Sequence, residues 1–181
     1  MILSSKQIIF EIRLWIERMV LGLNLCPFAH LPFREDRIQF LISKAKKEEQ
    51  LDEALLQACE TLIQTNSQTI ETILLIHPYI LEDFDNYCEY LAKANNLLFE
   101  HGFEGQLQIA SFHPNYCFQN NHYKDPANFT NRSPYPMLHI LREDSVANAI
   151  ENHRDVHAIP NQNILKLREL GTEQILKLLG I

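Results

Sequence analysis

Two segments of this sequence end with a histidine followed by a proline: His77 precedes Pro78 in LLIHP, and His113 precedes Pro114 in SFHP. Proline cannot donate a hydrogen bond to a neighbouring strand, so each histidine is predicted to occupy the last position of a strand. The carboxyl ends of parallel strands share one edge of a sheet, where open α/β sheets bind their ligands. Two imidazoles at that edge predict general acid–base catalysis by His77 and His113. Alternatively, each histidine only stabilises its strand end by bonding a carbonyl oxygen.

A third histidine, His139, alternates with Met137 and Leu141 and therefore shares their face of another predicted strand. A buried, hydrogen-bonded core histidine is one interpretation. If this strand ended beside the other two, His77, His113 and His139 would form a metal site, because neutral imidazoles are common ligands of divalent metals. No HExxH motif or other regular ligand spacing supports that site.

The segment TNRSPYP carries residues suited to an anionic substrate. Arg132 has a planar, permanently charged guanidinium that fits a carboxylate or phosphate, and the prolines that follow stiffen its backbone. Asn131 and Tyr135 lie in the same segment, and Arg142 ends the next predicted strand as a second cation. We therefore expect Asn131, Arg132, Tyr135 and Arg142 to bind substrate beside the histidines. In the alternative, Arg132 only fastens the loop through backbone carbonyls or a salt bridge.

The chain has four cysteines and no CxxC pair, which favours reduced thiols over a disulfide framework. Cys26 follows the C-terminus of a predicted helix, which raises the pKa of a thiol, and the sequence leaves its structural and functional interpretations open. Cys59 and Cys88 lie on apolar helix faces and are predicted to be core residues. Cys117 lies in a loop with no neighbour in the sequence to activate it.

The elements that must position these groups follow from apolar periodicity. Helical spacing occurs in residues 5–23, 48–64, 82–102, 144–150, 161–170 and 172–179, and strand patterns occur in residues 37–43, 72–76, 107–112 and 137–141. The helices between the first three strands imply right-handed crossovers. We therefore expect an α/β fold with a mainly parallel sheet of about four strands and helices packed on it. The sequence predicts one domain, residues 1–181, without a linker, and leaves the strand order open.

Residues 113–136 follow neither period. They contain four prolines, five asparagines and five aromatic residues. Loops this long inside a domain are usually functional or disordered, and disordered segments are poor in aromatic residues. The sequence therefore predicts one long ordered loop.

Composition excludes several classes of function. The net charge of -7 argues against a nucleic-acid partner, because binding to phosphates requires cations. With five glycines, the chain contains no GxGxxG or GxxxxGK motif, which excludes dinucleotide and P-loop nucleotide cofactors. Charged residues interrupt the apolar N-terminus, so no signal peptide or membrane span is predicted. We expect a cytoplasmic protein with no membrane partner.

Four blocks in this order, LNLCPFA, LLIHP, IASFHP and TNRSPYPMLHILRE, resemble the bacterial family catalogued as domain of unknown function 1415. The likeness covers nearly the whole chain and implies a cytoplasmic bacterial protein. The family motifs include eight candidate residues: Cys26, His77, His113, Asn131, Arg132, Tyr135, His139 and Arg142. The resemblance implies no reaction.

Three hypotheses about function remain. The first is a small-molecule enzyme in which His77 and His113 act as acid and base, or as metal ligands, while Arg132 and Arg142 hold an anionic substrate. The second is a binding module for an anionic metabolite or the acidic segment of a partner. In the third, these residues only fasten a long loop across the sheet. A divalent metal is the one cofactor that the residues suggest, and the oligomeric state is not predicted.

Overall fold

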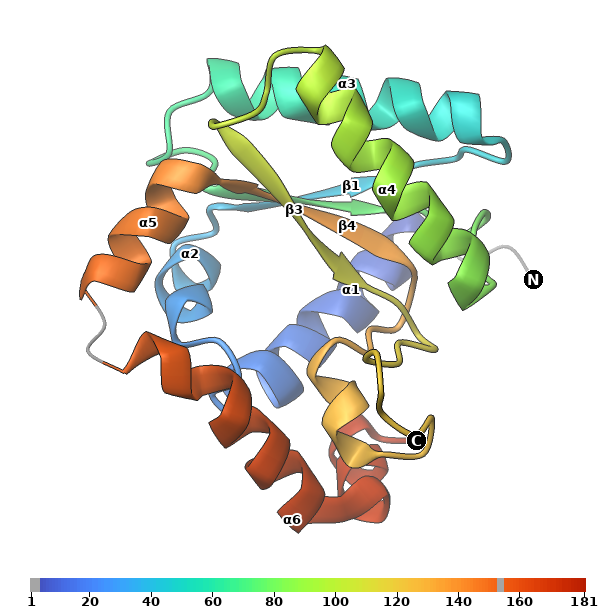
Figure 1. Cartoon of the computed structure of the whole chain (residues 1–181), viewed down its shortest axis with the longest axis vertical. Coiled ribbons are helices and arrows are strands. Elements are labelled where there is room, and N and C mark those ends of the chain that lie inside the picture. Colours follow the sequence, from blue (N-terminus) through green and yellow to red (C-terminus); the bar gives the residue numbers. More distant parts are fainter. Residues whose placement is uncertain (1–3, 153–154) are drawn as a thin grey trace.

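The computed structural model describes residues 4–152 and 155–181 (Figure 1). Its helices are α1 (Ser5–Trp15), the π-helix η1 (Ile16–Leu21), the 3-10 helix η2 (Pro27–Ala29), α2 (His30–Arg34), α3 (Glu48–Gln64), α4 (Phe84–Glu100), the 3-10 helix η3 (Pro126–Thr130), α5 (Glu143–Asn152), the 3-10 helix η4 (Val156–Ala158) and α6 (Ile159–Leu179). Its strands are β1 (Ile38–Ile42), β2 (Thr72–Ile76), β3 (Leu107–Phe112) and β4 (Met137–Arg142). The α/β class and the four strands agree with the prediction.

The sheet is mixed, and the prediction of a mainly parallel sheet is wrong. The strand order is β1-β2-β4-β3; β1 and β2 are parallel, whereas β4 is antiparallel to both of its neighbours. The strands β1, β2 and β3 run in one direction because a helix carries the chain back after β1 and again after β2. After β3 no helix does so. The loop of residues 113–136 enters β4 from the edge where β3 ends, so β4 runs the opposite way.

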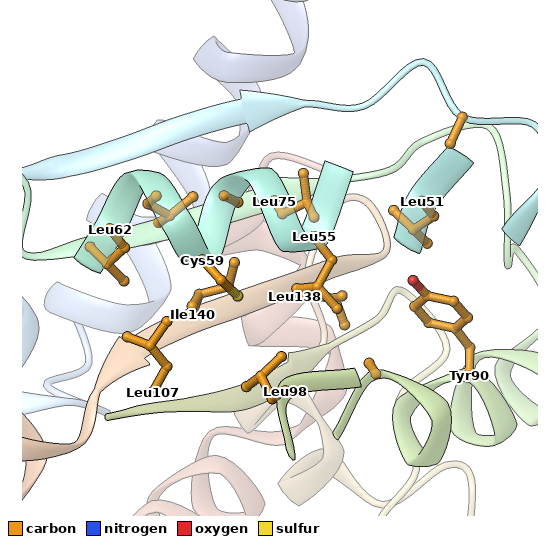
Figure 2. Packing of buried hydrophobic residues seen from close by; sticks show 14 of the residues in the cluster. Leu51, Leu55, Cys59, Leu62, Leu75, Tyr90, Leu98, Leu107, Leu138 and Ile140 are labelled. Atoms are coloured by element: carbon orange, nitrogen blue, oxygen red, sulfur yellow. The ribbon is translucent and has the colours of Figure 1, made fainter. Parts of the chain in front are cut away.

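Helices α3 and α4 cover one face of the sheet, as Figure 1 shows. The buried residues of α3 recur every three or four positions, which places them on one side of the helix. Figure 2 shows this stripe, including Leu55 and Cys59, turned toward Leu138 and Ile140 of β4. These four side chains are almost completely buried, so this face forms a closed apolar core.

Helix α4 corrects one prediction about the cysteines. Cys59 is buried as predicted, but Cys88 is exposed. The buried residues of α4 include Tyr87 and Tyr90, and the stripe continues with Ala94 and Leu98. Successive residues of a helix point about 100° apart, so Cys88 is turned away from the stripe that contains its neighbour Tyr87.

The opposite face of the sheet packs against α1, η1 and α6. Ile12, Trp15 and Met19 pack there with Met137 of β4 and Leu167 of α6. Helix α1 begins where the Ser4 side chain accepts a hydrogen bond from the backbone N–H of Gln7.

Helix α6 replaces the two helices that were predicted on either side of Gly171. Gly171 has φ 72° and ψ 160°, a conformation open to glycine and costly for other residues, and the helix bends there. The second half of α6 can therefore approach η3, the short helix in the long loop (Figure 1). Within the described ranges no helix, α6 included, combines the length and the apolar content that a membrane crossing requires.

Candidate functional site

His77 and His113 lie at the same edge of the sheet. The register places the last residues of β2 and β3, Ile76 and Phe112, on either side of Met137 at the start of β4. The two histidines that follow therefore flank the point where the chain enters β4. The sequence predicts this shared edge because β2 and β3 run in the same direction. Both histidines are 0% exposed.

Both imidazoles stabilise the turn between β2 and α4. The Nδ1 atom of His77 donates to the carbonyl oxygen of Ile80 (3.1 Å), and Nε2 of His113 donates to that of Leu81 (3.0 Å). The Nδ1 atom of His113 accepts from the backbone N–H of Asn115 (3.0 Å). Leu81 has a φ of 60°, which is costly for a branched side chain, and these bonds hold the turn that imposes it. The contacts match the structural alternative, in which each histidine bonds a carbonyl.

Tyr87 of α4 lies between the two histidines. Its ring centroid is 5.8 Å from that of His77 and 5.0 Å from that of His113, so the imidazoles are no farther apart than the sum of these distances. Its hydroxyl donates to the carbonyl oxygen of Met137 (2.8 Å) and accepts from the backbone N–H of Phe112 (3.1 Å). We call His77, Tyr87 and His113 the histidine cluster.

The histidine cluster is electrically neutral at pH 7. Burial lowers the pKa of His77 to about 4, because the charged imidazolium would lose its water, and burial also lowers the pKa of His113. Burial raises the pKa of Tyr87. The Nε2 atom of His77 is buried and has no partner within the described residues, so this imidazole keeps one free lone pair.

His139 lies on the opposite face of the sheet from the histidine cluster. It shares that face with Met137, which packs against α1, and its ring centroid is 6.1 Å from that of Phe112. Burial lowers its pKa to about 4. The structure therefore does not bring His77, His113 and His139 together as metal ligands. In the part of the chain that the structure describes, no three His, Cys, Asp or Glu side chains form a group that could hold a metal ion.

Arg142 also lies away from the histidine cluster, because β4 runs antiparallel and ends at the other edge of the sheet. Its Nη2 atom donates to the carbonyl oxygens of Leu62 (2.7 Å), Thr65 (2.6 Å) and Ile70 (3.0 Å). Carbonyls at a helix C-terminus lack partners within the helix, and Arg142 satisfies those at the end of α3. The expectation that Arg142 supplies a second cation beside the histidines does not agree with this position.

Arg132 and Asn128 organise the long loop. The buried Asn128 accepts from the backbone N–H of Phe118 (3.1 Å) and donates to the carbonyl oxygen of Tyr123 (3.1 Å). Arg132 donates from Nε to the carbonyl oxygen of Tyr116 (3.0 Å) and from Nη2 to that of Tyr123 (2.7 Å). Its guanidinium carbon lies 4.6 Å from the ring centroid of Tyr123. Arg132 therefore fastens the loop, as the alternative predicts, but it also borders a cavity.

Asn131 and Tyr135 connect the same segment to the rest of the fold. The Nδ2 atom of Asn131 donates to the carbonyl oxygen of Ser111 (3.0 Å). The hydroxyl of Tyr135 donates to the carboxylate of Glu11 in α1. Burial and this carboxylate raise the pKa of Tyr135. Both residues hold the segment in place, and neither lines the cavity.

The cavity, of about 570 Å³, lies between α1 and η1, the long loop, and the C-terminal end of α6. Its apolar lining includes Leu14, Trp15, Phe129, Leu176 and Leu179. Glu11, Arg18, Arg132 and Ser133 contribute polar groups. Small-molecule sites in proteins have volumes of roughly 300–1,000 Å³ and combine an apolar lining with a few polar groups, so the cavity has the dimensions and the lining of such a site.

The two arginines in the cavity have no carboxylate partner among the described residues. The Nη1 atom of Arg18 donates to the carbonyl oxygen of Leu179 (3.0 Å), and Arg132 bonds the two carbonyls named above, which are neutral acceptors. Four other arginines in the described ranges each pair with a carboxylate: Arg13, Arg34, Arg37 and Arg168. Glu11 also lines the cavity and offsets one of these two charges.

Glu11, Trp15 and Arg18 are lining residues that the sequence analysis missed. They are spaced by four and three residues, which places them on one face of a helix, and this spacing was the available signal. Trp15 belongs to the predicted apolar stripe and is 4% exposed, but its indole N–H has no partner within the described residues. Arg18 lies in η1, and π-helical turns occur frequently at functional sites.

Two cysteines near these segments are half-buried. Burial raises the pKa of the Cys26 thiol, which disfavours the reactive thiolate. The Sγ atom of Cys117 lies 3.5 Å from the carbonyl oxygen of Asn121, to which it donates. Neither cysteine lines the cavity.

A family model described as "Protein of unknown function (DUF1415)" matches residues 7–177. No curated protein and no solved structure matches the chain. The matched range contains every predicted site residue and all of the cavity lining except Leu179, Gly180 and Ile181.

Proposed function

Because the chain belongs to the DUF1415 family, whose description names no function, we propose a function from the cavity: it binds a small molecule that joins an anionic group to an apolar body. One observation carries the proposal. Arg18 and Arg132, two guanidiniums that pair with no carboxylate in the part of the chain that the structure describes, border one cavity with a mainly apolar lining. This function corresponds to the binding module among the hypotheses from the sequence.

Arg132 supports binding of the anionic group. A guanidinium has five N–H donors, and the loop carbonyls use Nε and Nη2, so the Nη1 donors have no partner within the described residues. The same carbonyl bonds and the rings of Tyr123 and Phe129 hold the guanidinium in one orientation. A donor that is already oriented loses little entropy when a carboxylate or phosphate binds.

The apolar lining supports binding of the rest of the molecule. Leu14 of α1, Phe129 of η3 and Leu176 of α6 come from three separate parts of the chain and border the same space. Removing apolar surface from water contributes about 25 cal/mol per Å². An aliphatic or aromatic body therefore gains free energy in the cavity, which a small hydrophilic anion does not.

Catalysis by His77 and His113 stays a prediction, as do a divalent metal and a cytoplasmic location. We rank binding first because a general acid or base must reach the proton that it transfers. The two imidazoles are 0% exposed, and neither lines the cavity.

The proposed function can be tested through Trp15, the only tryptophan in the chain, which lines the cavity. We would titrate the protein with octanoate and with octanamide, its neutral counterpart of equal length, and record tryptophan fluorescence. Octanoate should give a saturable change at a concentration about tenfold lower than octanamide, because it adds a charge-assisted hydrogen bond. Equal responses to the two compounds, or no saturation with octanoate, would contradict the proposed function.

A further inference from the structure

Strand β1 forms one edge of the sheet and pairs with β2 alone. The carbonyl oxygen of Arg37 and the backbone N–H of Ser43 both bond β2. In a parallel pair, alternate residues bond the neighbouring strand, so Ile38, Phe40 and Ile42 turn their N–H and C=O groups toward the outer side. Within the described ranges these outward groups form no hydrogen bond.

The side chains of β1 do not protect this edge. Proteins keep other chains away from an edge strand with charged side chains, prolines or bulges. The sequence of β1, IQFLI, contains no charge and no proline, and its register with β2 is continuous. All five residues of β1 are half-buried, whereas all five of β2 are buried. The outer side of β1 is therefore open to pairing with another extended chain.

A pocket of about 260 Å³ lies beside this edge, between β1 and α3. Gln39 and Leu41 line it from β1, and Ala54 and Ala58 line it from α3. Small-molecule sites have volumes of roughly 300–1,000 Å³, so the pocket suits one apolar side chain better than a whole ligand. The side chains of a strand alternate between the two faces of a sheet. Every second side chain of a strand added beside β1 would thus lie on the face that holds the pocket.

Three lysines, Lys44, Lys46 and Lys47, follow the end of β1. All three are exposed, and none forms a salt bridge with a carboxylate of the described residues. Glu48, which comes next in the chain, pairs with Lys93 of α4 instead (3.1 Å). The end of β1 therefore carries positive charge that the fold does not neutralise.

The charges at the start of β1 are paired. Arg37 forms salt bridges with Glu35 (2.9 Å) and Glu71 (3.2 Å), and Asp36 pairs with Arg13. The two ends of the strand thus differ in what they attract. Complementary charge steers partners and fixes their register, so acidic residues of a partner should lie beside the lysines.

We propose that β1 binds an extended acidic segment of a partner protein, which adds a strand to the edge of the sheet. Backbone hydrogen bonds provide affinity in this mode of recognition, and a pocket for alternate side chains provides specificity. Antiparallel pairing, the slightly more stable arrangement, places the acidic residues before the apolar residue that enters the pocket. This surface is separate from the cavity, and the proposal does not rest on the proposed function.

A second copy of the chain fits this edge less well than an acidic segment does. Antiparallel pairing of two β1 strands centred on Phe40 places Lys44 opposite Asp36, which already pairs with Arg13. It also places Lys46 opposite Arg34, which has the same charge. Like charges opposite each other destabilise a pair of strands.

Backbone methylation of a peptide tests the pairing. The probe is a fluorescein-labelled peptide of sequence DEEDTVLTVT, whose leucine lies opposite Leu41 when the acidic residues lie beside the lysines. Methylation of the amide nitrogens of its sixth and eighth residues, which face Ile42 and Phe40, should weaken binding at least about tenfold in fluorescence anisotropy, because two hydrogen bonds are lost. The matched control is methylated at the seventh and ninth residues, whose N–H groups face away, and should bind as the unmodified peptide does. Equal affinities of the two methylated peptides, or no saturable binding of the unmodified one, would overturn the proposal.

Replacement of the lysines tests the charge of the partner. The triple variant Lys44→Gln, Lys46→Gln and Lys47→Gln should bind the unmodified peptide about 3- to 100-fold more weakly, because exposed ion pairs each contribute little but act together here. A control triple variant with the same net charge replaces three exposed lysines elsewhere by glutamine: Lys6, Lys124 and Lys177. Equal affinities of the two triple variants would overturn the assignment of an acidic partner.

Amide hydrogen exchange locates the bound peptide on the chain. The peptide should slow exchange at the N–H groups of Phe40 and Ile42 and leave those of Gln39 and Leu41, which already bond β2, unchanged. Sedimentation equilibrium tests for a second copy on the same edge. A dimer in which Phe40 and Ile42 are protected without peptide, and which the peptide does not dissociate, would overturn the proposal.

Discussion

The histidine cluster and the cavity meet at two consecutive residues of the chain. His113 is 0% exposed and bonds the turn before α4, whereas Pro114 lines the cavity on the other side. In the histidine cluster the three side chains are buried, neutral and bonded to the backbone. In the cavity, Arg18 and Arg132 also bond carbonyls, but they keep their charge and their free donors.

This difference shows how the surroundings decide what a reactive residue type does. Imidazole is the side chain most often used as a general acid or base, yet burial removes the charge of His77, and the backbone occupies its Nδ1. A guanidinium cannot lose its proton in a protein, so Arg132 stays positive although it also bonds backbone carbonyls. In the histidine cluster, hydrogen bonds to backbone carbonyls fix the turn before α4. In the cavity, such bonds orient the guanidinium of Arg132 for binding.

The variant Tyr87→Phe should separate the two regions most strongly. It leaves the carbonyl oxygen of Met137 and the N–H of Phe112 buried without their partner, which should cost roughly 4 kcal/mol of unfolding free energy. Urea denaturation measures this loss. Tyr123→Phe is the matched control, because Tyr123 is 54% exposed and its hydroxyl bonds only a side chain, and it should cost less than roughly 0.5 kcal/mol. Equal losses would mean that the histidine cluster does not hold the sheet edge.

The pH dependence of stability should reveal the neutral state of His77. Its pKa is about 4 in the folded protein and 6.5 in the unfolded chain, so the unfolded state binds more protons between these values. The unfolding free energy should therefore fall as the pH drops from 6.5 to 4, with about 3 kcal/mol of the loss due to His77. His77→Asn keeps a donor for Ile80 and cannot be protonated, so it should show a smaller loss. The same loss in both proteins would refute this assignment.

The variant Arg132→Lys sharpens the comparison because Arg132 has two roles. Lysine keeps the charge but cannot bond the carbonyls of Tyr116 and Tyr123 together, so the unfolding free energy should fall by about 1 to 2 kcal/mol. Thermal denaturation measures the loss. The control is Arg34→Lys, whose side chain is 76% exposed, and it should leave the melting temperature nearly unchanged. An unaffected Arg132→Lys would show that this arginine does not fasten the loop.

Much of the fold could be predicted because its patterns are local. The apolar run TILLI gave β2 its observed bounds, and helical crossovers gave β1, β2 and β3 a common direction, which places His77 and His113 at one edge. The direction of β4 could not be read in this way, because it depends on where the loop of residues 113–136 returns to the sheet. That error also produced the expectation that Arg142 lies near the other site residues, whereas His139 lies apart from them because it is on the opposite face of the sheet.

The cavity was harder to predict, because no single segment contains it. Arg132 was expected to bind an anion and does line the cavity, but Arg18 and Trp15 were hidden in a helix whose periodicity indicates only a buried face. The wall of the cavity that α6 forms depends on the bend at Gly171, which brings the C-terminal end of α6 to the long loop. This wall forms only when the folded chain brings α6 to the loop, so no residue spacing in the sequence predicts it.

The most direct test of the central claim is the affinity for octanoate in three variants that each remove one positive charge. Arg18→Gln and Arg132→Gln remove the charges that line the cavity, and Arg34→Gln removes an exposed charge elsewhere. Calorimetry should show about tenfold weaker binding for each cavity variant, because each loses a charge-assisted hydrogen bond. Arg34→Gln should bind octanoate as the unaltered protein does. If all three variants bind alike, the two cavity arginines do not recognise an anion, and the account of the cavity is wrong.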